Sequence, residues 1–181
     1  MKIIVFCLTH NSAEVLPFFL RHYSMFADEI SVWDDNSTDD TVTLLMRNDK
    51  VVLRDWPHRT GIDEDLFLAH WQEWYPKAAY KFDWCMIPDC DEFIYSPDML
   101  GTLALAKSVG IQVIKPRGFN LVGDGFPKDD GHSQIYELNP MGVPAPVYSK
   151  PVIFQPHIKI NWIRGKQIGR ASCRERVLTG V

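Results

Sequence analysis

Short apolar runs alternate with segments of helical hydrophobic spacing through the first two thirds of the chain. This alternation predicts an α/β domain, with a mostly parallel mixed sheet flanked by crossover helices. The runs predicted as strands cover residues 3–8, 30–33, 51–56, 82–88, 111–115 and 148–154. Between residues 117 and 146 glycine, proline and aspartate become frequent, which indicates ligand-facing loops with short strands.

The helical segments fall between these strands and carry recognisable end signals. They cover about residues 17–26, 38–47, 64–75 and 97–109. For the last of them, Ser96 is the expected N-cap and Pro97 the first helical residue, while Gly110 stands just past the end.

Composition places the chain among ordinary globular proteins. Its 181 residues are 46% hydrophobic and 23% charged, which suits one domain with a single sizeable core. The net charge of −4 argues against a nucleic-acid or anionic-membrane partner, because no stripe of lysine and arginine is present to neutralise phosphates. A small ligand is the better expectation.

Targeting and cysteine signals are weak. The apolar run at residues 3–8 is too short for a membrane span or a signal peptide, so we expect no integral membrane segment. The cysteines, Cys7, Cys85, Cys90 and Cys173, show no paired C-x-x-C spacing, and the histidines show no zinc-site spacing. A reducing cytoplasmic location is the simplest expectation.

The end of the chain changes character abruptly at "IGRASCRERV", residues 168–177. This stretch resembles the conceptual translation of a common sequencing-adapter oligonucleotide. We therefore expect a native domain over residues 1–167, C-terminally incomplete, and a non-native tail over residues 168–181. The alternative is a basic surface tail, and in neither case does the stretch carry chemistry.

Two acidic clusters follow predicted strands. Asp34 and Asp35 come after the second strand, and Asp89, Asp91 and Glu92 come after the fourth. Ligands of open α/β sheets gather at the carboxyl ends of strands, so the clusters should converge. Asp89 and Asp91 would point to the same side of an extended segment, where a hard divalent cation relieves their repulsion. The alternative is a solvated acidic turn that caps the next helix.

Four segments in order resemble the GT-A fold glycosyltransferases, in the family 2 branch with W-x-x-x-x-D-x-D-E-F. The segments are "FCLTHNSAEVLPFFLRHY", "VWDDNSTDDT", "FDWCMIPDCDEFIY" and "YSKPVIFQP". The resemblance covers about residues 2–163, and it implies an inverting transfer of a sugar from a nucleotide-sugar donor to a saccharide or other hydroxyl acceptor.

The resemblance also implies roles for individual residues. Thr9, Asn11, Asp34 and Asp35 would line the nucleoside pocket, with carboxylate oxygens accepting hydrogen bonds from the base or ribose. Asp89 would face the ribose or the metal.

A divalent metal, Mn²⁺ or Mg²⁺, is the implied cofactor. Asp91 would ligate it together with Asp89, and Glu92 would support them. The metal would bridge the donor diphosphate and neutralise the charge that builds on the leaving group.

An inverting displacement also needs a general base for the acceptor. Asp124, Asp129 and Asp130 lie in the loop-rich stretch, and Asp124 is the preferred candidate because Gly123 and Gly125 free its backbone. A plain turn aspartate is the alternative for Asp124. Lys150 is either a phosphate contact or a surface lysine.

Two other functions compete with glycosyl transfer. A metal-dependent phosphohydrolase or nucleotidyltransferase could use the same acids, and a degenerate domain could bind sugar or nucleotide without catalysis. A nucleotidyltransferase usually has a glycine-rich, basic phosphate loop, whereas "THNSAEV" has neither glycine nor lysine. The family's glycine-histidine pair is missing where the adapter-like stretch begins, so the chain as given could be inactive.

Overall fold

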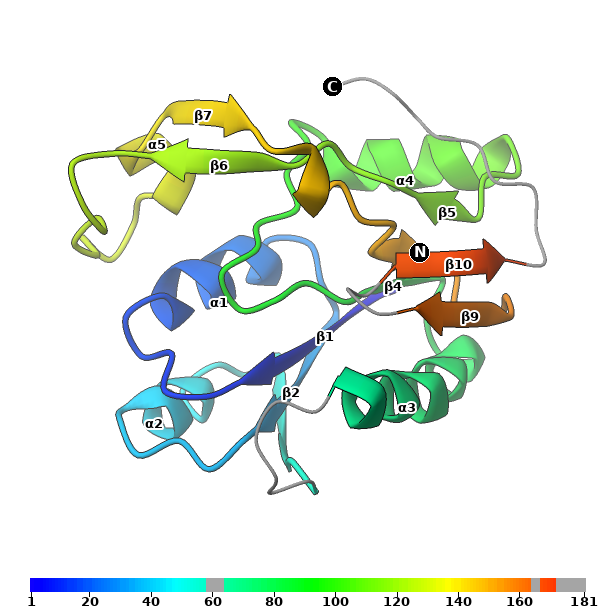
Figure 1. The fold of residues 1–181 in the computed structure, drawn as a ribbon, viewed down its shortest axis with the longest axis horizontal. Helices are drawn as coiled ribbons and strands as arrows, with labels where there is room; N and C mark the ends of the chain where they lie inside the picture. Colours follow the sequence, from blue (N-terminus) through cyan, green and yellow to red (C-terminus); the bar gives the residue numbers. More distant parts are fainter. Residues whose placement is uncertain (58–63, 164–166, 172–181) are drawn as a thin grey trace.

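Six strands form one central sheet in the computed structural model, which describes residues 1–57, 64–163 and 167–171. Their order across the sheet is β3-β2-β1-β4-β8-β5, and Figure 1 shows β1 near the middle of the molecule beside β2. The strands are β1 (Ile3–Thr9), β2 (Glu29–Asp34), β3 (Val51–Asp55), β4 (Trp84–Met86), β5 (Val113–Ile114) and β8 (Ile153–Phe154). The first four are parallel, and β8 runs antiparallel to both β4 and β5. The predicted mostly parallel mixed sheet is confirmed.

Strand β1 is apolar from Ile3 to Leu8, as expected for a central strand with both faces covered. On one face, Val5 and Cys7 pack with α1 (Leu16–Ser24), α2 (Thr41–Leu45) and α4 (Met99–Ser108). On the other face, Phe6 packs with Trp33 and with Trp71 of α3 (Glu64–Trp74). The 3₁₀ helix η1 (Tyr75–Tyr80) follows α3 on the same side. Helices therefore flank the sheet on both faces, as predicted.

The predicted start of α4 is wrong. The N-cap is Asp98, whose Oδ1 accepts a hydrogen bond from the backbone N–H of Gly101 at 2.8 Å. Ser96 is not the cap because the helix begins later, at Met99, and the Ser96 hydroxyl instead contacts that of Thr102 at 2.9 Å. Gly110 stands just past the helix with φ of +75°, as its position in the sequence indicated.

The region between residues 117 and 146 consists of short elements, as predicted. Strands β6 (Phe119–Val122) and β7 (Met141–Pro144) form a separate antiparallel hairpin, with α5 (Ile135–Leu138) between them in the chain. The 3₁₀ helix η2 (Pro146–Tyr148) then leads toward β8. The strand expected over residues 148–154 is therefore only two residues long.

The last described elements are β9 (Ile160–Ile163) and β10 (Gln167–Ala171), which pair as an antiparallel two-stranded sheet. Strand β10 crosses the expected domain boundary at residue 167, whereas residues 172–181 lie outside the described residues. The non-native origin of residues 168–181 stays a prediction. None of the helices in the described parts of the chain has the length and apolar character needed to cross a membrane.

Candidate functional site

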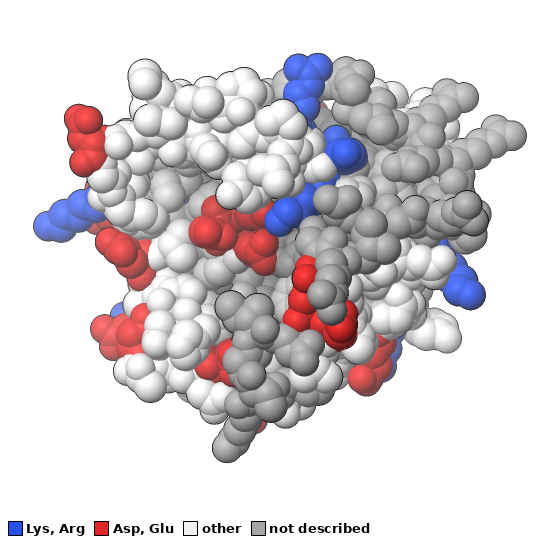
Figure 2. Space-filling view, in the orientation of Figure 1, with Lys and Arg blue, Asp and Glu red and all other residues white. Residues whose placement is uncertain are grey.

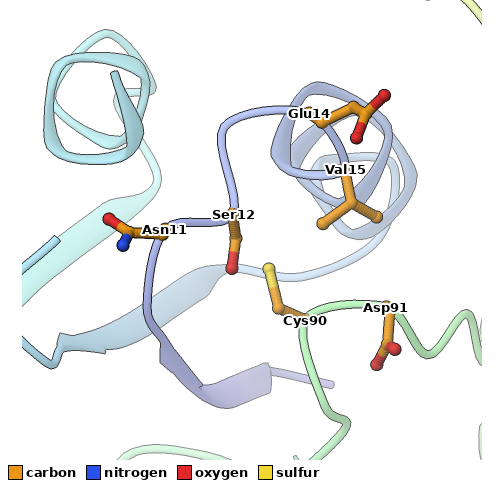
Figure 3. Close-up of a pocket in the computed structure, with 6 residues that line it drawn as sticks. All are labelled: Asn11, Ser12, Glu14, Val15, Cys90 and Asp91. Carbon is orange, nitrogen blue, oxygen red and sulfur yellow. The ribbon is translucent and has the colours of Figure 1, made fainter. Parts of the chain in front are cut away.

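The order of the strands creates one crevice at the carboxyl edge of the sheet. Strands β2 and β3 lie on one side of β1 and β4 lies on the other, so the winding direction changes between β1 and β4. Open α/β sheets bind ligands at such a switch point. A cavity of about 320 Å³ lies there, between the loop after β1 and the turn after β4 (Figure 3). Its lining residues are Asn11, Ser12, Glu14, Val15, Cys90 and Asp91.

Thr9 and Asn11 connect neighbouring loops around this cavity. The buried hydroxyl of Thr9 donates to Cys90 Sγ at 3.7 Å, which links β1 to the turn after β4. Asn11 has φ of 46°, a left-handed conformation that asparagine tolerates, and its Oδ1 accepts from the Thr38 N–H at 2.7 Å. Figure 3 shows the Asn11 amide directed away from Cys90. Both side chains thus hold the loops of the predicted nucleotide site together.

Asp34 is the last residue of β2, where it pairs in register with Thr9 of β1, and Asp35 follows directly after the strand. Asp34 Oδ2 accepts from the Ser37 N–H at 3.0 Å, while its buried Oδ1 makes no hydrogen bond within the described residues. Asp35 donates its backbone N–H to the Thr9 carbonyl at 2.9 Å and accepts from Asn36 through its carboxylate at 3.3 Å. Neither carboxylate lines the cavity, and their contact with a nucleotide stays a prediction.

The acidic turn, residues 89–92, is closed by hydrogen bonds between Asp89 and Glu92 and is held in place by Tyr23 of α1. The Glu92 N–H donates to the Asp89 carbonyl at 3.0 Å, and the Asp89 N–H donates to Glu92 Oε2 at 3.1 Å. Tyr23 donates its hydroxyl to the Glu92 carbonyl at 2.9 Å and accepts from the Ile94 N–H at 3.1 Å. Burial raises the pKa of Tyr23 well above its usual value, so the phenol keeps its proton. No local pattern in the sequence predicted this contact between α1 and the turn.

Lys150 is a partner of the acidic turn. The sequence had allowed either a phosphate contact or a surface lysine, and the structure does not show an exposed surface lysine at this position. Its Nζ lies 3.0 Å from Glu92 Oε1 and 3.6 Å from Asp89 Oδ2, and its side chain is 15% exposed. Burial by itself lowers the pKa of Lys150, but the hydrogen bond and charge of Glu92, together with Asp89, outweigh burial and raise it. Figure 2 shows acidic side chains grouped near the middle of one face with basic ones directly beside them.

Of the three acids in the turn, Asp91 is the one that lines the cavity, and it is exposed. Its carboxylate makes no hydrogen bond or ion pair with another residue of the described segments. In the described part of the chain, no three His, Cys, Asp or Glu side chains are arranged to hold a metal ion. Mg²⁺ usually takes one or two carboxylates together with substrate phosphates. Asp91 and Asp89 carry such carboxylates on one turn, and of the two only Asp91 lines the cavity.

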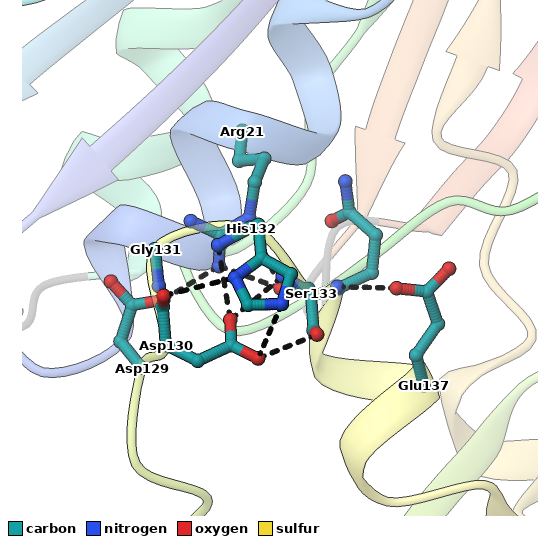
Figure 4. Close-up of polar contacts among 8 residues, drawn as sticks. Arg21, Asp129, Asp130, Gly131, His132, Ser133 and Glu137 are labelled. Atoms are coloured by element: carbon teal, nitrogen blue, oxygen red, sulfur yellow. Dashed lines mark hydrogen bonds and ion pairs between the residues drawn. The ribbon is translucent and has the colours of Figure 1, made fainter.

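The loop that carries Asp124 docks on α1. Arg21 donates to Asp129 Oδ1 and to the Ser133 carbonyl, both at 2.7 Å (Figure 4). Asp130 accepts from Ser133, and these local hydrogen bonds hold its pKa well below the usual range. Asp129 and Asp130 thus shape the loop. Asp124 is exposed and is not among the residues that line the cavity, so its role as a base stays a prediction.

Comparison with known proteins does not show a family for this chain. No family model matches this chain, and no curated protein matches it. One similar solved structure is described as the crystal structure of a mycobacterial protein. It is 21% identical, with a TM-score of 0.40. The match covers 63% of this chain and 39% of that one.

Proposed function

We propose that this chain is a metal-dependent glycosyltransferase of the GT-A fold, family 2, which moves a sugar from a nucleotide-sugar to an acceptor hydroxyl with inversion. The observation that carries the proposal is the cavity at the switch point of the sheet, with Asp91 on its wall.

Contacts among the four family-like segments support the proposal. The Asp35 N–H donates to the Thr9 carbonyl at 2.9 Å, which joins the first and second segments. The Thr9 hydroxyl donates to Cys90 Sγ at 3.7 Å, which joins the first and third. Lys150 pairs with Glu92 at 3.0 Å, which joins the third and fourth. Segments far apart in the sequence thus meet around one edge of the sheet, where the resemblance requires a donor site.

The oxygen ligands at this edge suit a hard divalent ion such as Mn²⁺ or Mg²⁺. Asp91 would hold the ion, with Asp89 as the second carboxylate, and the donor diphosphate would supply the remaining oxygens. When bound, the metal neutralises the charge that develops on the diphosphate leaving group. Glu92 and Tyr23 keep the turn that carries both aspartates in one conformation.

The test is a product analysis with UDP-sugars and GDP-sugars in the presence of Mn²⁺, with and without saccharide acceptors. A glycosyltransferase releases a nucleoside diphosphate and a free or transferred sugar. A phosphohydrolase or nucleotidyltransferase would instead cleave a phosphate linkage, and a binding domain would leave the donor intact. Either of the last two results would overturn the proposal.

Asp91→Ala should lower turnover roughly a thousandfold, because several kcal/mol of metal stabilisation are lost. The matched control is Asp49→Ala, since Asp49 is an exposed aspartate just before β3, at the opposite edge of the parallel strands. The control should retain full turnover. Near-normal turnover of the Asp91 variant at saturating Mn²⁺ would reject Asp91 as a ligand.

A further inference from the structure

Lys150 holds its two acidic partners unequally. It hydrogen-bonds to Glu92 Oε1 at 3.0 Å, whereas Asp89 Oδ2 lies at 3.6 Å. The Asp89 side chain is also the more exposed of the two, at 43% against 24% for Glu92. Charge-assisted bonds weaken with distance and with solvent exposure. Breaking the contact between Lys150 and Asp89 should therefore cost less free energy than breaking the contact between Lys150 and Glu92.

The backbones around Lys150 and Glu92 are fixed. The Lys150 carbonyl accepts from the Val152 N–H at 2.9 Å, and the Val152 carbonyl accepts from the Ile87 N–H at 3.0 Å beside β4. Glu92 is held by Tyr23 and by the Asp89 N–H. The backbone segments that carry Lys150 and Glu92 are therefore held near each other, and the ammonium group of Lys150 lies 3.0 Å from Glu92 Oε1.

A divalent cation that binds Asp89 would lie close to this ammonium group. Their repulsion opposes cation binding, and so does the loss of the Asp89 contact. A nucleoside diphosphate reverses the balance, because its negative charges attract the cation and the ammonium together.

We propose that Lys150 is a built-in counter-ion of the acidic turn, which a divalent cation displaces from Asp89 while Lys150 stays bound to Glu92. This arrangement makes cation binding depend on the nucleoside diphosphate. The inference rests on the proposed function in that Asp89 and Asp91 receive the cation.

The experiment measures Mn²⁺ binding without nucleotide, by calorimetry or by electron paramagnetic resonance of free Mn²⁺. Lys150→Met keeps the length of the side chain and removes its charge. It should bind Mn²⁺ about tenfold more tightly than the wild type. The same substitution at Lys107, which pairs with Asp83 before β4, should leave Mn²⁺ affinity unchanged. Equal or weaker Mn²⁺ binding by Lys150→Met would overturn the inference.

Two further variants keep the inference testable if Lys150→Met does not fold. Lys150→Arg can hold both carboxylates with its guanidinium group, so it should bind Mn²⁺ more weakly than the wild type. Unchanged affinity of this variant would contradict the inference even if Lys150→Met were insoluble. Adding Asp89→Asn to Lys150→Met should abolish the tenfold gain, and a gain that persists would show that Asp89 is not the contested ligand.

A second titration, with UDP and GDP at saturating Mn²⁺, separates this inference from the proposed function. A gain in Mn²⁺ affinity in Lys150→Met, with no binding of either nucleotide, would support the counter-ion and weigh against the glycosyltransferase. If the protein cleaves a nucleotide-sugar but Lys150→Met has unchanged Mn²⁺ affinity, the result would support the glycosyltransferase and overturn the counter-ion inference.

Discussion

His22 is a buried histidine whose protonation should destabilise the fold in mild acid. It lies on α1 with 1% of its surface exposed. Its Nε2 bonds to the Ile94 carbonyl at 3.0 Å, so this nitrogen carries the proton and donates. Its Nδ1 then accepts from the Tyr136 hydroxyl at 3.4 Å. The neutral ring is therefore satisfied at both nitrogens, by groups that carry no charge.

The magnitude follows from the pKa. Burial lowers the pKa of His22 from 6.5 to about 4, with the Ile94 hydrogen bond opposing the shift only in part. Each pKa unit corresponds to about 1.4 kcal/mol, so full protonation costs the fold about 3 kcal/mol. The unfolded chain binds the proton first, so stability is complete above pH 6.5 and is lost as the pH falls toward 4. At pH 5 the loss is about 2 kcal/mol.

The assay is urea unfolding between pH 7.5 and 4, for the wild type and for His22→Gln. Glutamine can donate to the Ile94 carbonyl but does not titrate, so acid-sensitive carboxylates affect both proteins equally. The wild type should lose about 2 kcal/mol more than the variant on going from pH 7.5 to pH 5. Parallel curves of unfolding free energy against pH would refute the reasoning.

Two further substitutions test contacts that position the site and its neighbouring helix. Tyr23→Phe removes the hydroxyl that bonds to the Glu92 carbonyl and to the Ile94 N–H, so the free energy of unfolding should fall by about 2 kcal/mol. A loss below about 0.5 kcal/mol would show that the hydroxyl does not support the acidic turn. Asp98→Ala removes the N-cap of α4 and should cost about 1 kcal/mol by urea unfolding, whereas Asp98→Asn should retain most of the stability. Equal losses for alanine and asparagine at that position would contradict the cap.

The sequence by itself determined the elements whose signals are local. The apolar run of β1 is continuous because both faces of a central strand are buried, and that pattern is visible without any partner. The acids at or just past the ends of β2 and β4 could be located because strand ends mark the ligand edge of an open α/β sheet. Local signals did not identify the right residue where several possible N-caps stood together. In "SPD", residues 96–98, Asp98 and not Ser96 is the N-cap of α4.

Tertiary structure alone decided which side chains meet at the site. Antiparallel pairing of β8 with β4 brings Lys150 to Glu92, 58 residues away in sequence. Tyr23 reaches the same turn across 69 residues, from the buried face of α1. Periodicity reports which face of an element is buried, but it does not report which element covers that face or how far a side chain must reach. The partners of the acidic turn therefore became visible only once the chain was folded.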